Sequence, residues 1–432
     1  MFNLIKIAAR NLRRYSRRTL LTASLITLGV TAVLLFVAVT GSFKSMMIGQ
    51  ITDSMLGHIQ IHKKGYVASV ENLPLDATLQ LYGSYSRGKA SLNWLAQAVA
   101  RQDDICWYDN ADVFEAYGSF KPTPAVSFDA GKKVFKWGKG YAWNPVAFID
   151  RPKDPNNTEE ALEGFIGADL ELIKSFAGPL QTMALTGVAL PVWEGVNEGF
   201  GEQNHVNLAA KLYLLYLDTD LDLLLYSGNS RSTRYGFSFS RNLATNFELH
   251  GEIAHVPEQP QKVLEADGAI ATRTVSDTRY LLGFRYLTET EITTIVEYYH
   301  NGDGYTEEEL RRFMQTAADG YEQYLATDSD LLLQKAASLN EGAYGRPQPG
   351  RDYLYARAAM KEPFELLYFT PSLTAIVNLN DASFSLSPEA AYSGITNIEL
   401  RLKFTWVNGG HLSEYGEKAA RSRTELRLRY FF

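Results

Sequence analysis

Apolar and polar side chains alternate strictly along most of this chain. In TNIELRLKFTWV, Leu400, Leu402 and Phe404 fall on one face, whereas the residues between them are charged or polar. Because successive side chains of a strand point to opposite faces, this period of two predicts a strand between an apolar and a polar medium. The pattern recurs in TRYGFSFSR, NFELHGEIAHV and TRYLLGFRYL, with turn-forming links such as NLATN and NLNDAS between segments.

Seventeen such strand-like segments lie between residues 91 and 432, among them 124–137, 264–275 and 278–287. Many are longer than the five or six residues usual for strands of soluble proteins. A soluble β-sandwich would also alternate, but the long strands and the charged residues on their polar faces favour a membrane barrel. Bacterial barrels of one chain have even strand numbers. We therefore predict a mainly β protein, an antiparallel transmembrane β-barrel of roughly 16 strands over residues 81–432.

The last nine residues, TELRLRYFF, alternate in the same way and end on an aromatic residue. Leu426, Leu428, Tyr430 and Phe432 share the outward face. This arrangement resembles the C-terminal strand signal of bacterial outer-membrane proteins, which the barrel-assembly machinery reads. The resemblance implies the bacterial outer membrane as location and the lipid bilayer and that machinery as partners.

The polar faces of the predicted strands carry charged residues of both signs. A barrel of about 16 strands encloses an aqueous channel unless something plugs it. Opposed rows of acidic and basic side chains would then filter solutes by size and charge. The predicted pore-lining residues are Arg234, Glu248, His250, Glu252, Arg285, Glu297, Glu399, Arg401, Lys403, Arg427 and Arg429.

One insert has helical rather than strand periodicity. In TEEELRRFMQTAADGYEQYL, Thr306 and Glu309 have the spacing of a capping box, and Leu310, Phe313 and Met314 begin an apolar stripe. A helical loop is therefore predicted near residues 305–340. Its apolar stripe packs either on the barrel rim, on a neighbouring loop, or inside the lumen.

The stretch from Phe128 to Pro155 breaks the alternation, because Lys132 and Lys133 are followed by Val134 and Phe135. A β-bulge near Gly131 is the simplest way to restore it. This segment, with its WGKG motif and Asn-Pro turn, resembles a porin-like family of Gram-negative outer-membrane proteins similar to alginate-export barrels. The resemblance extends to the C-terminus and implies a porin-like channel or export-associated barrel that passes small or charged solutes.

The N-terminal segment has a different character. Residues 19–43 include no charged side chain, and at 1.5 Å per residue a helix of this length covers about 37 Å, enough to cross a bilayer. Basic residues precede it, which predicts a cytoplasmic N-terminus. A signal peptide is the alternative, but the apolar core exceeds about 15 residues and AVTGS is a poor cleavage site. We therefore predict an uncleaved transmembrane helix at about 19–43, which would favour the inner membrane.

Residues 1–80 also resemble a known family. The basic lead IAARNLRRYSRRTLL, the apolar helix and the strand GHIQIHKKGY resemble the N-terminal part of ABC-transporter permeases of the macrolide-exporter or lipoprotein-releasing type. Such permeases have three further spanning helices, and no second long apolar run follows Phe43. The alternative function is an inner-membrane permease subunit of an ABC export system. A gene fusion or a mistaken gene model would also explain the two unlike ends.

Composition narrows the function further. A net charge of -7 argues against a nucleic-acid-binding protein, and one cysteine, Cys106, excludes an intramolecular disulfide. An aromatic content of 12% with a mean hydropathy of -0.18 is typical of a barrel, in which only alternate residues face lipid. His58 and His62 share one strand face, for which solvation is a commoner explanation than metal binding. No catalytic motif occurs, so we predict no enzyme activity, no cofactor and no metal.

Overall fold

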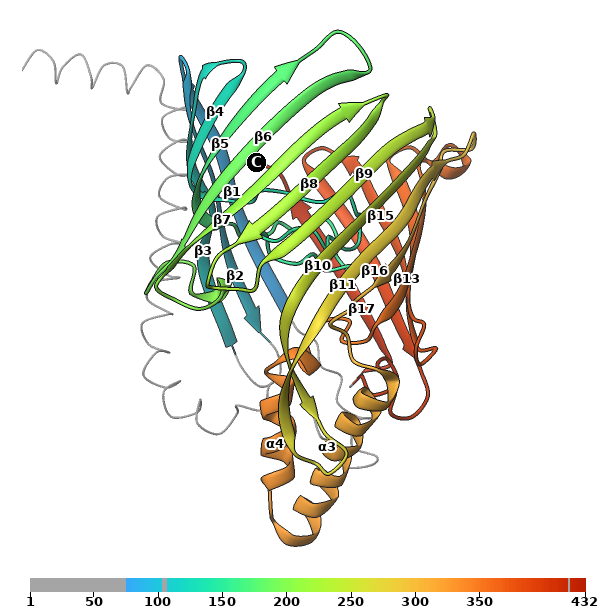
Figure 1. Cartoon of the computed structure of the whole chain (residues 1–432). Coiled ribbons are helices and arrows are strands. Elements are labelled where there is room, and N and C mark those ends of the chain that lie inside the picture. Colours follow the sequence, from blue (N-terminus) through green and yellow to red (C-terminus); the bar gives the residue numbers. More distant parts are fainter. Residues whose placement is uncertain (1–74, 103–106, 419) are drawn as a thin grey trace, which may run out of the picture. The chain divides into compact units, whose positions relative to one another are not determined.

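A computed structural model describes residues 75–102, 107–418 and 420–432, and these form one 17-stranded sheet (Figure 1). The strands are β1 Leu75–Arg87, β2 Ala90–Gln102, β3 Trp107–Thr123, β4 Val126–Lys133, β5 Phe165–Ser175, β6 Leu180–Val192, β7 His205–Tyr216, β8 Thr219–Ser227, β9 Arg234–Ala244, β10 Phe247–Leu264, β11 Ile270–Leu287, β12 Ile292–His300, β13 Asp352–Met360, β14 Phe369–Asn378, β15 Phe384–Ile395, β16 Ile398–Asn408 and β17 Ser422–Tyr430. The helices are α3 Glu307–Thr327 and α4 Leu331–Asn340, with short 3-10 turns η1 Glu198–Phe200, η2 Ala343–Gly345 and η3 Pro363–Glu365.

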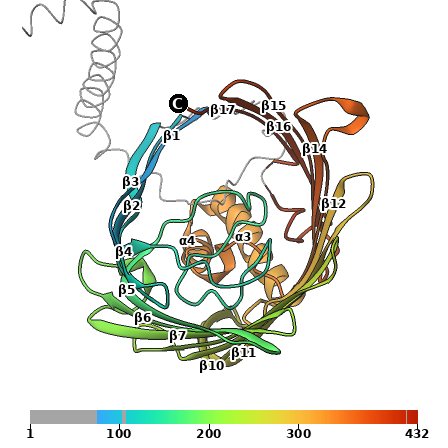
Figure 2. The ribbon, with the colours of Figure 1, turned by 90° about the horizontal axis from the view of Figure 1, so that it is seen from above.

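Each strand pairs antiparallel with the next one along the chain, from β1–β2 to β16–β17. The sheet curls into a barrel (Figure 2). The predicted antiparallel barrel is therefore confirmed. Its strand number is odd among the described residues, whereas an even number was expected.

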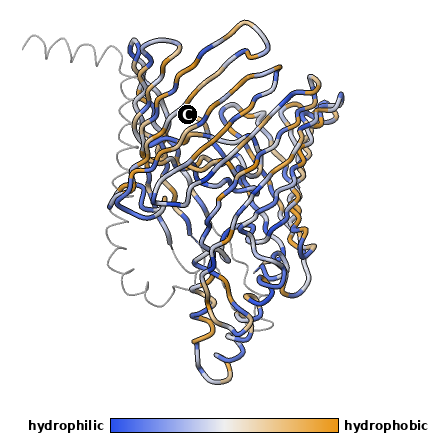
Figure 3. Tube along the Cα trace, viewed as in Figure 1, coloured by the Kyte–Doolittle hydropathy of each residue, from blue (hydrophilic) through white to orange (hydrophobic). Residues whose placement is uncertain are grey.

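The two faces of the sheet differ as the alternation predicts. On β16 and β17, Leu402 lies opposite Leu426 and Leu400 opposite Leu428, and these leucines point outward. Leu402 is 51% exposed and Leu426 is 74% exposed. Hydrophobic and hydrophilic positions alternate along the strands in the same way elsewhere (Figure 3). Exposed leucine and aromatic side chains at every second position form an outer surface suited to an apolar medium.

The two ends of the barrel differ in the length of their connections. One end, here called the short-turn end, carries two-residue turns such as 88–89, 217–218 and 396–397. The opposite end, here called the long-loop end, carries the connections 134–164, 193–204, 301–351 and 409–421. Because β17 runs toward the short-turn end, the C-terminus lies there.

The helical insert packs at the long-loop end, on the hairpin of β10 and β11 (Figure 1). Arg312 Nη1 donates to the Leu264 carbonyl oxygen at 2.8 Å, and Arg273 pairs with Glu309 at 2.7 Å. Thr306 and Glu309 form the predicted capping box. The helical loop near 305–340 is thus confirmed, and it lies against a neighbouring hairpin. Neither helix of the described chain combines the length and apolar character needed to cross a bilayer.

Two local predictions are wrong. There is no bulge at Gly131, which pairs in register with Tyr117 and Gly167. The alternation ends because the strand itself ends at Lys133, four residues before the predicted limit, and the chain then leaves the sheet.

The predicted strand 264–275 is also wrong, because it spans the turn between β10 and β11. The register of β10 shifts between Val256 and Gln259, and this irregularity accommodates Pro257, whereas Pro260 pairs in register with Thr274. Proline in a sheet is usually found at such irregular positions, and here it made one long strand resemble two short ones.

The N-terminal predictions fall largely outside the described residues. The transmembrane helix at about 19–43, the permease-like strand, and His58 and His62 all precede Leu75. The expected boundary between residues 80 and 81 lies inside β1, whose sequence LDATLQLYGSYSR already alternates.

Candidate pore constriction

The connection between β4 and β5, residues 134–164, runs inside the barrel (Figure 2). Glu252 of β10 holds its first part. One carboxylate oxygen of Glu252 accepts hydrogen bonds from the backbone N–H groups of Lys139 and Gly140, the latter at 2.6 Å, and the other accepts from Val146 at 3.3 Å. A buried carboxylate that accepts several N–H groups fixes the course of the backbone around it.

A second buried carboxylate, Glu297 of β12, continues this arrangement. Its two oxygens accept from the backbone N–H groups of Tyr141 at 2.5 Å and Ala142 at 2.8 Å. His250 Nε2 lies 2.9 Å from Glu297 Oε1, and both side chains are fully buried. Two carboxylates of the wall, on β10 and β12 with β11 between them, therefore bind the consecutive amides of residues 139–142.

Steric constraints explain why both Gly138 and Gly140 of the WGKG motif are glycine. Gly138 has a φ of 105°, and a Cβ there would lie 2.9 Å from Glu252 Oε1. A Cβ on Gly140 would lie 2.1 Å from the Trp143 carbonyl oxygen. Only glycine lets the backbone approach the carboxylate this closely in this conformation.

Apolar side chains complete the anchoring. Trp137, Val146, Phe148 and Ile149 are almost fully buried and form one core with buried residues of β5 to β8 and of β10. In a second core, Trp143 stacks on Tyr299 with ring centroids 5.1 Å apart. The stretch 137–150 therefore supplies much of the interior packing of the barrel.

Asp150 closes this stretch on itself. Its carboxylate accepts from the backbone N–H groups of Phe135 at 2.7 Å and Trp137 at 3.0 Å. Burial raises the pKa of Asp150 above its ordinary value, although these hydrogen bonds oppose the shift. Asp150, at the end of the anchored stretch, is thus hydrogen-bonded to the backbone at the beginning of that stretch.

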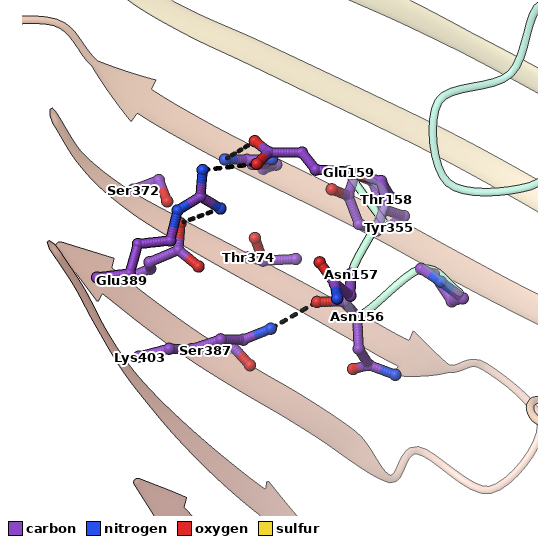
Figure 4. A pocket seen from close by; sticks show the side chains of 13 residues that line it. Asn156, Asn157, Thr158, Glu159, Tyr355, Ser372, Thr374, Ser387, Glu389 and Lys403 are labelled. Carbon is purple, nitrogen blue, oxygen red and sulfur yellow. Dashed lines mark hydrogen bonds and ion pairs between the residues drawn. The ribbon is translucent and has the colours of Figure 1, made fainter. Parts of the chain in front are cut away.

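The tip of the loop, residues 155–159, reaches the opposite wall, formed by β13 to β16 (Figure 4). Arg401 Nη2 lies 2.6 Å from Glu159 Oε2, and Arg357 Nη2 lies 3.9 Å from Glu159 Oε1. Lys403 donates to the Asn156 carbonyl oxygen. Glu389 and the hydroxyl-bearing Ser372, Thr374 and Ser387 line the wall beneath the tip.

A cavity of about 560 Å³ adjoins the tip, and Lys139, Tyr141, Lys153 and Arg357 are among its lining residues. Burial lowers the pKa of Lys153, whose Nζ donates to the Gly140 carbonyl oxygen at 2.5 Å. Burial raises the pKa of Glu159, but the positive charges of Arg401 and Arg357 lower it by more. The pKa of Glu159 therefore lies below its ordinary value. The tip therefore presents an ionised carboxylate to a basic wall.

The predicted pore-lining residues occupy three different settings. Glu252, His250 and Glu297 lie beneath the loop and are buried. Arg401 and Lys403 contact the tip directly.

The other predicted residues lie apart from the tip contacts. Glu248 accepts a hydrogen bond from the Tyr141 hydroxyl at 3.1 Å, and Arg285 lies opposite Glu248 on β11. Glu399 pairs with Arg401 and Arg429, and Arg427 pairs with Glu425. Arg234 stands at the start of β9, at the long-loop end.

Sequence reasoning missed the loop's own contribution. Glu159, Asn156 and Asp150 lie in an irregular segment with no periodicity, and Arg357 stands in the short strand DYLYARAAM. The signal that was present is the break in alternation after Lys133, together with the two glycines of WGKG. No group of three or more metal-ligating side chains occurs among the described residues.

No family model and no curated protein matches this chain. Among solved structures, Wzi of Escherichia coli, described as an outer-membrane protein involved in group 1 capsule assembly and a carbohydrate-binding β-barrel, is 10% identical with a TM-score of 0.48, covering 77% of this chain and 75% of that one. Pseudomonas aeruginosa OccD3 is 12% identical with a TM-score of 0.42, covering 82% and 85%. Acinetobacter baumannii OccAB2 is 9% identical with a TM-score of 0.45, covering 83% and 91%.

These likenesses assign the chain to no family. The resemblances to ABC-transporter permeases and to alginate-export barrels gain no support from the comparisons.

Proposed function

We propose that this protein is a porin-like channel of the bacterial outer membrane, whose lumen is narrowed by loop 134–164 and passes small or charged solutes. The observation that carries the proposal is a barrel with an apolar outer surface and an inward loop, anchored to the wall, whose tip meets charged and polar side chains of the opposite wall. Only closed barrels and helices satisfy their backbone hydrogen bonds in lipid. Short turns at the C-terminal end and longer connections at the opposite end are also typical of such barrels.

The proposed selectivity arises where the loop tip meets the wall. Glu159 on the tip and Glu389 on β15 supply negative charge, whereas Arg357, Arg401 and Lys403 supply positive charge. Opposed charges across a narrow passage create a transverse field that orients and sorts solutes. The other charged residues of β16 and β17, Glu399, Arg427 and Arg429, extend this charged lining in our proposal.

Two further parts of the proposal concern assembly and origin. We propose that Leu426, Leu428, Tyr430 and Phe432 form the signal that the barrel-assembly machinery reads, since they follow one another on the outward face of the last strand and the residues after it. We also propose that the permease-like N-terminal segment was joined to a barrel sequence. No feature of the described residues favours the alternative of an inner-membrane permease subunit.

Planar-bilayer recordings test the channel. Replacing Arg401 and Arg427 with Glu should shift the reversal potential in a salt gradient toward cation selectivity, because two lining cations become anions. Arg241→Glu is the matched control, since Arg241 is an exposed arginine of β9 outside the proposed lining. An unchanged reversal potential in the double variant would remove both residues from the pore, and no channels at all from the folded wild type would refute the proposed function.

A further inference from the structure

Two arginines at the long-loop end have no carboxylate partner in the described part of the chain. Arg231 lies in the connection 228–233, and Arg234 is the first residue of β9; both are half-buried. Among the described residues, neither forms an ion pair with Asp or Glu. Arg234 Nε is buried without any hydrogen-bond partner. Buried charged groups are normally paired, so an unpaired guanidinium inside a protein calls for an acceptor.

The neighbouring charges increase the imbalance. Arg279 pairs with Asp277 at 2.6 Å and with Asp303 at 3.2 Å, and Arg346 pairs with Asp303 at 2.8 Å. Within the described part of the chain, Asp277 and Asp303 pair with Arg279 and Arg346, and neither carboxylate pairs with Arg231 or Arg234. The positive charges of Arg231 and Arg279 repel that of Arg234. Asp277 attracts Arg234, but this carboxylate is already paired with Arg279.

Arg231 is held in place before any ligand arrives. Its guanidinium carbon lies 3.9 Å from the centre of the Phe200 ring, and its Nε donates to the Phe200 carbonyl oxygen. Phe200 in turn packs edge-to-face on Phe165, with centroids 5.1 Å apart. Burial lowers the pKa of Arg231 to about 10, which still leaves it charged at neutral pH. A cation fixed by stacking loses little freedom when it binds an anion.

We propose that Arg231 and Arg234 together bind a doubly charged oxyanion, such as a phosphate monoester, at the long-loop end of the barrel. The two uncompensated positive charges match an anion of two negative charges. The planar guanidinium group presents parallel N–H donors that fit phosphate oxygens. The site is separate from the tip of loop 134–164, so it does not depend on the proposed channel activity.

Isothermal titration calorimetry of the folded full-length chain in detergent tests this inference, with inorganic phosphate as the probe and chloride at equal ionic strength as the reference. The wild type should bind phosphate more tightly than chloride. Arg231→Gln with Arg234→Gln should weaken phosphate binding about tenfold or more, as expected when charge-assisted hydrogen bonds are lost. Arg241→Gln, an exposed arginine of the same strand, should bind as the wild type does.

Folding of each variant is checked by its heat-dependent mobility shift on a gel. In phosphate-free buffer Arg234→Gln should be at least as stable as the wild type, because an unpaired charge is removed. If the double variant does not fold, Arg231→Gln and Arg234→Lys replace it, each with weakened binding expected. Phosphate binding equal to chloride binding in the wild type, or undiminished in the folded variants, would overturn the proposal. Acetate that binds as tightly as phosphate would overturn the assignment to a doubly charged group.

Discussion

The anchored stretch 137–150 and the tip 155–159 belong to one loop but are held by different physics. The anchored stretch donates backbone N–H groups to two buried carboxylates, Glu252 and Glu297, and its apolar side chains form the barrel's core. The tip is held by charged side chains, and the Glu159 side chain remains 44% exposed. Buried hydrogen bonds of this kind are costly to break, whereas an exposed ion pair contributes little to stability. The stability of the barrel and the width of its constriction therefore depend on different residues.

The largest effect is expected at the anchored stretch. Glu252→Ala removes the acceptor of three backbone N–H groups, those of Lys139, Gly140 and Val146. At about 1 kcal/mol or more for each orphaned group, the free energy of unfolding should fall by roughly 3 kcal/mol or more. Denaturant titration in detergent measures it. Glu258→Ala, an exposed position of the same strand, is the control; equal stability of the two variants would refute the anchoring role.

A smaller effect is expected at Gly138, where the backbone rather than the acceptor is changed. Gly138→Ala places a Cβ near Glu252 at a φ of 105°. A strained backbone of this kind costs on the order of 1–3 kcal/mol, so the unfolding midpoint should decrease. Gly187→Ala in β6, where a Cβ meets nothing within 4 Å, should have little effect. A fully stable Gly138→Ala variant would mean that the loop can be held without this close approach.

The tip should respond in the opposite way, with a small effect on stability and a visible effect on conduction. Glu159→Gln weakens the ion pairs with Arg401 and Arg357. Because the carboxylate is partly exposed, the unfolding free energy should change by less than about 1 kcal/mol. Single-channel recordings should show longer periods of higher conductance as the tip leaves the wall. A large loss of stability, or unchanged recordings, would contradict the distinction between tip and anchor.

The weakest effect is expected from pH. The pKa of Glu159 lies below its ordinary value of 4.5, so its ion pair is fully present above that pH and is lost as pH falls through the lowered pKa. Conductance at fixed salt should therefore be steady from neutral pH down to about 5 and should rise only in more acidic solution. Glu159→Gln should lack this acidic rise, and its persistence in the variant would assign the titration to another group.

The sequence predicts the barrel well because alternation is a local property, and successive side chains of a strand point to opposite faces of the sheet. Leu400, Leu402 and Phe404 are apolar at every second position, and this is sufficient to place their strand. The capping box at Thr306 is equally local, and its helix was predicted correctly. The first strand, Leu75–Arg87, was not predicted, because residues 1–80 were assigned to the permease-like segment although the strand's own sequence alternates.

The constriction was harder to predict because it depends on contacts between distant parts of the chain. Glu252 meets the amides of Lys139 and Gly140 more than one hundred residues away. Charged residues on a polar strand face indicate a solvated pore lining. The local sequence does not distinguish Glu252 and Glu297, which are buried under the loop, from Arg401, which contacts the loop's tip. The two glycines of WGKG were the available sign that the backbone approaches another group closely.

The central claim is that loop 134–164 lies inside a water-filled barrel and narrows it. Single-channel conductance of the wild type, compared with a variant in which residues 154–160 are deleted, tests this most directly. Because the anchored stretch 137–150 is retained, the variant should fold and show the heat-dependent mobility shift of the wild type. We expect a clearly larger conductance in the variant at equal salt. Equal conductance from two folded proteins would mean that the tip does not lie in the conduction path and would contradict the account.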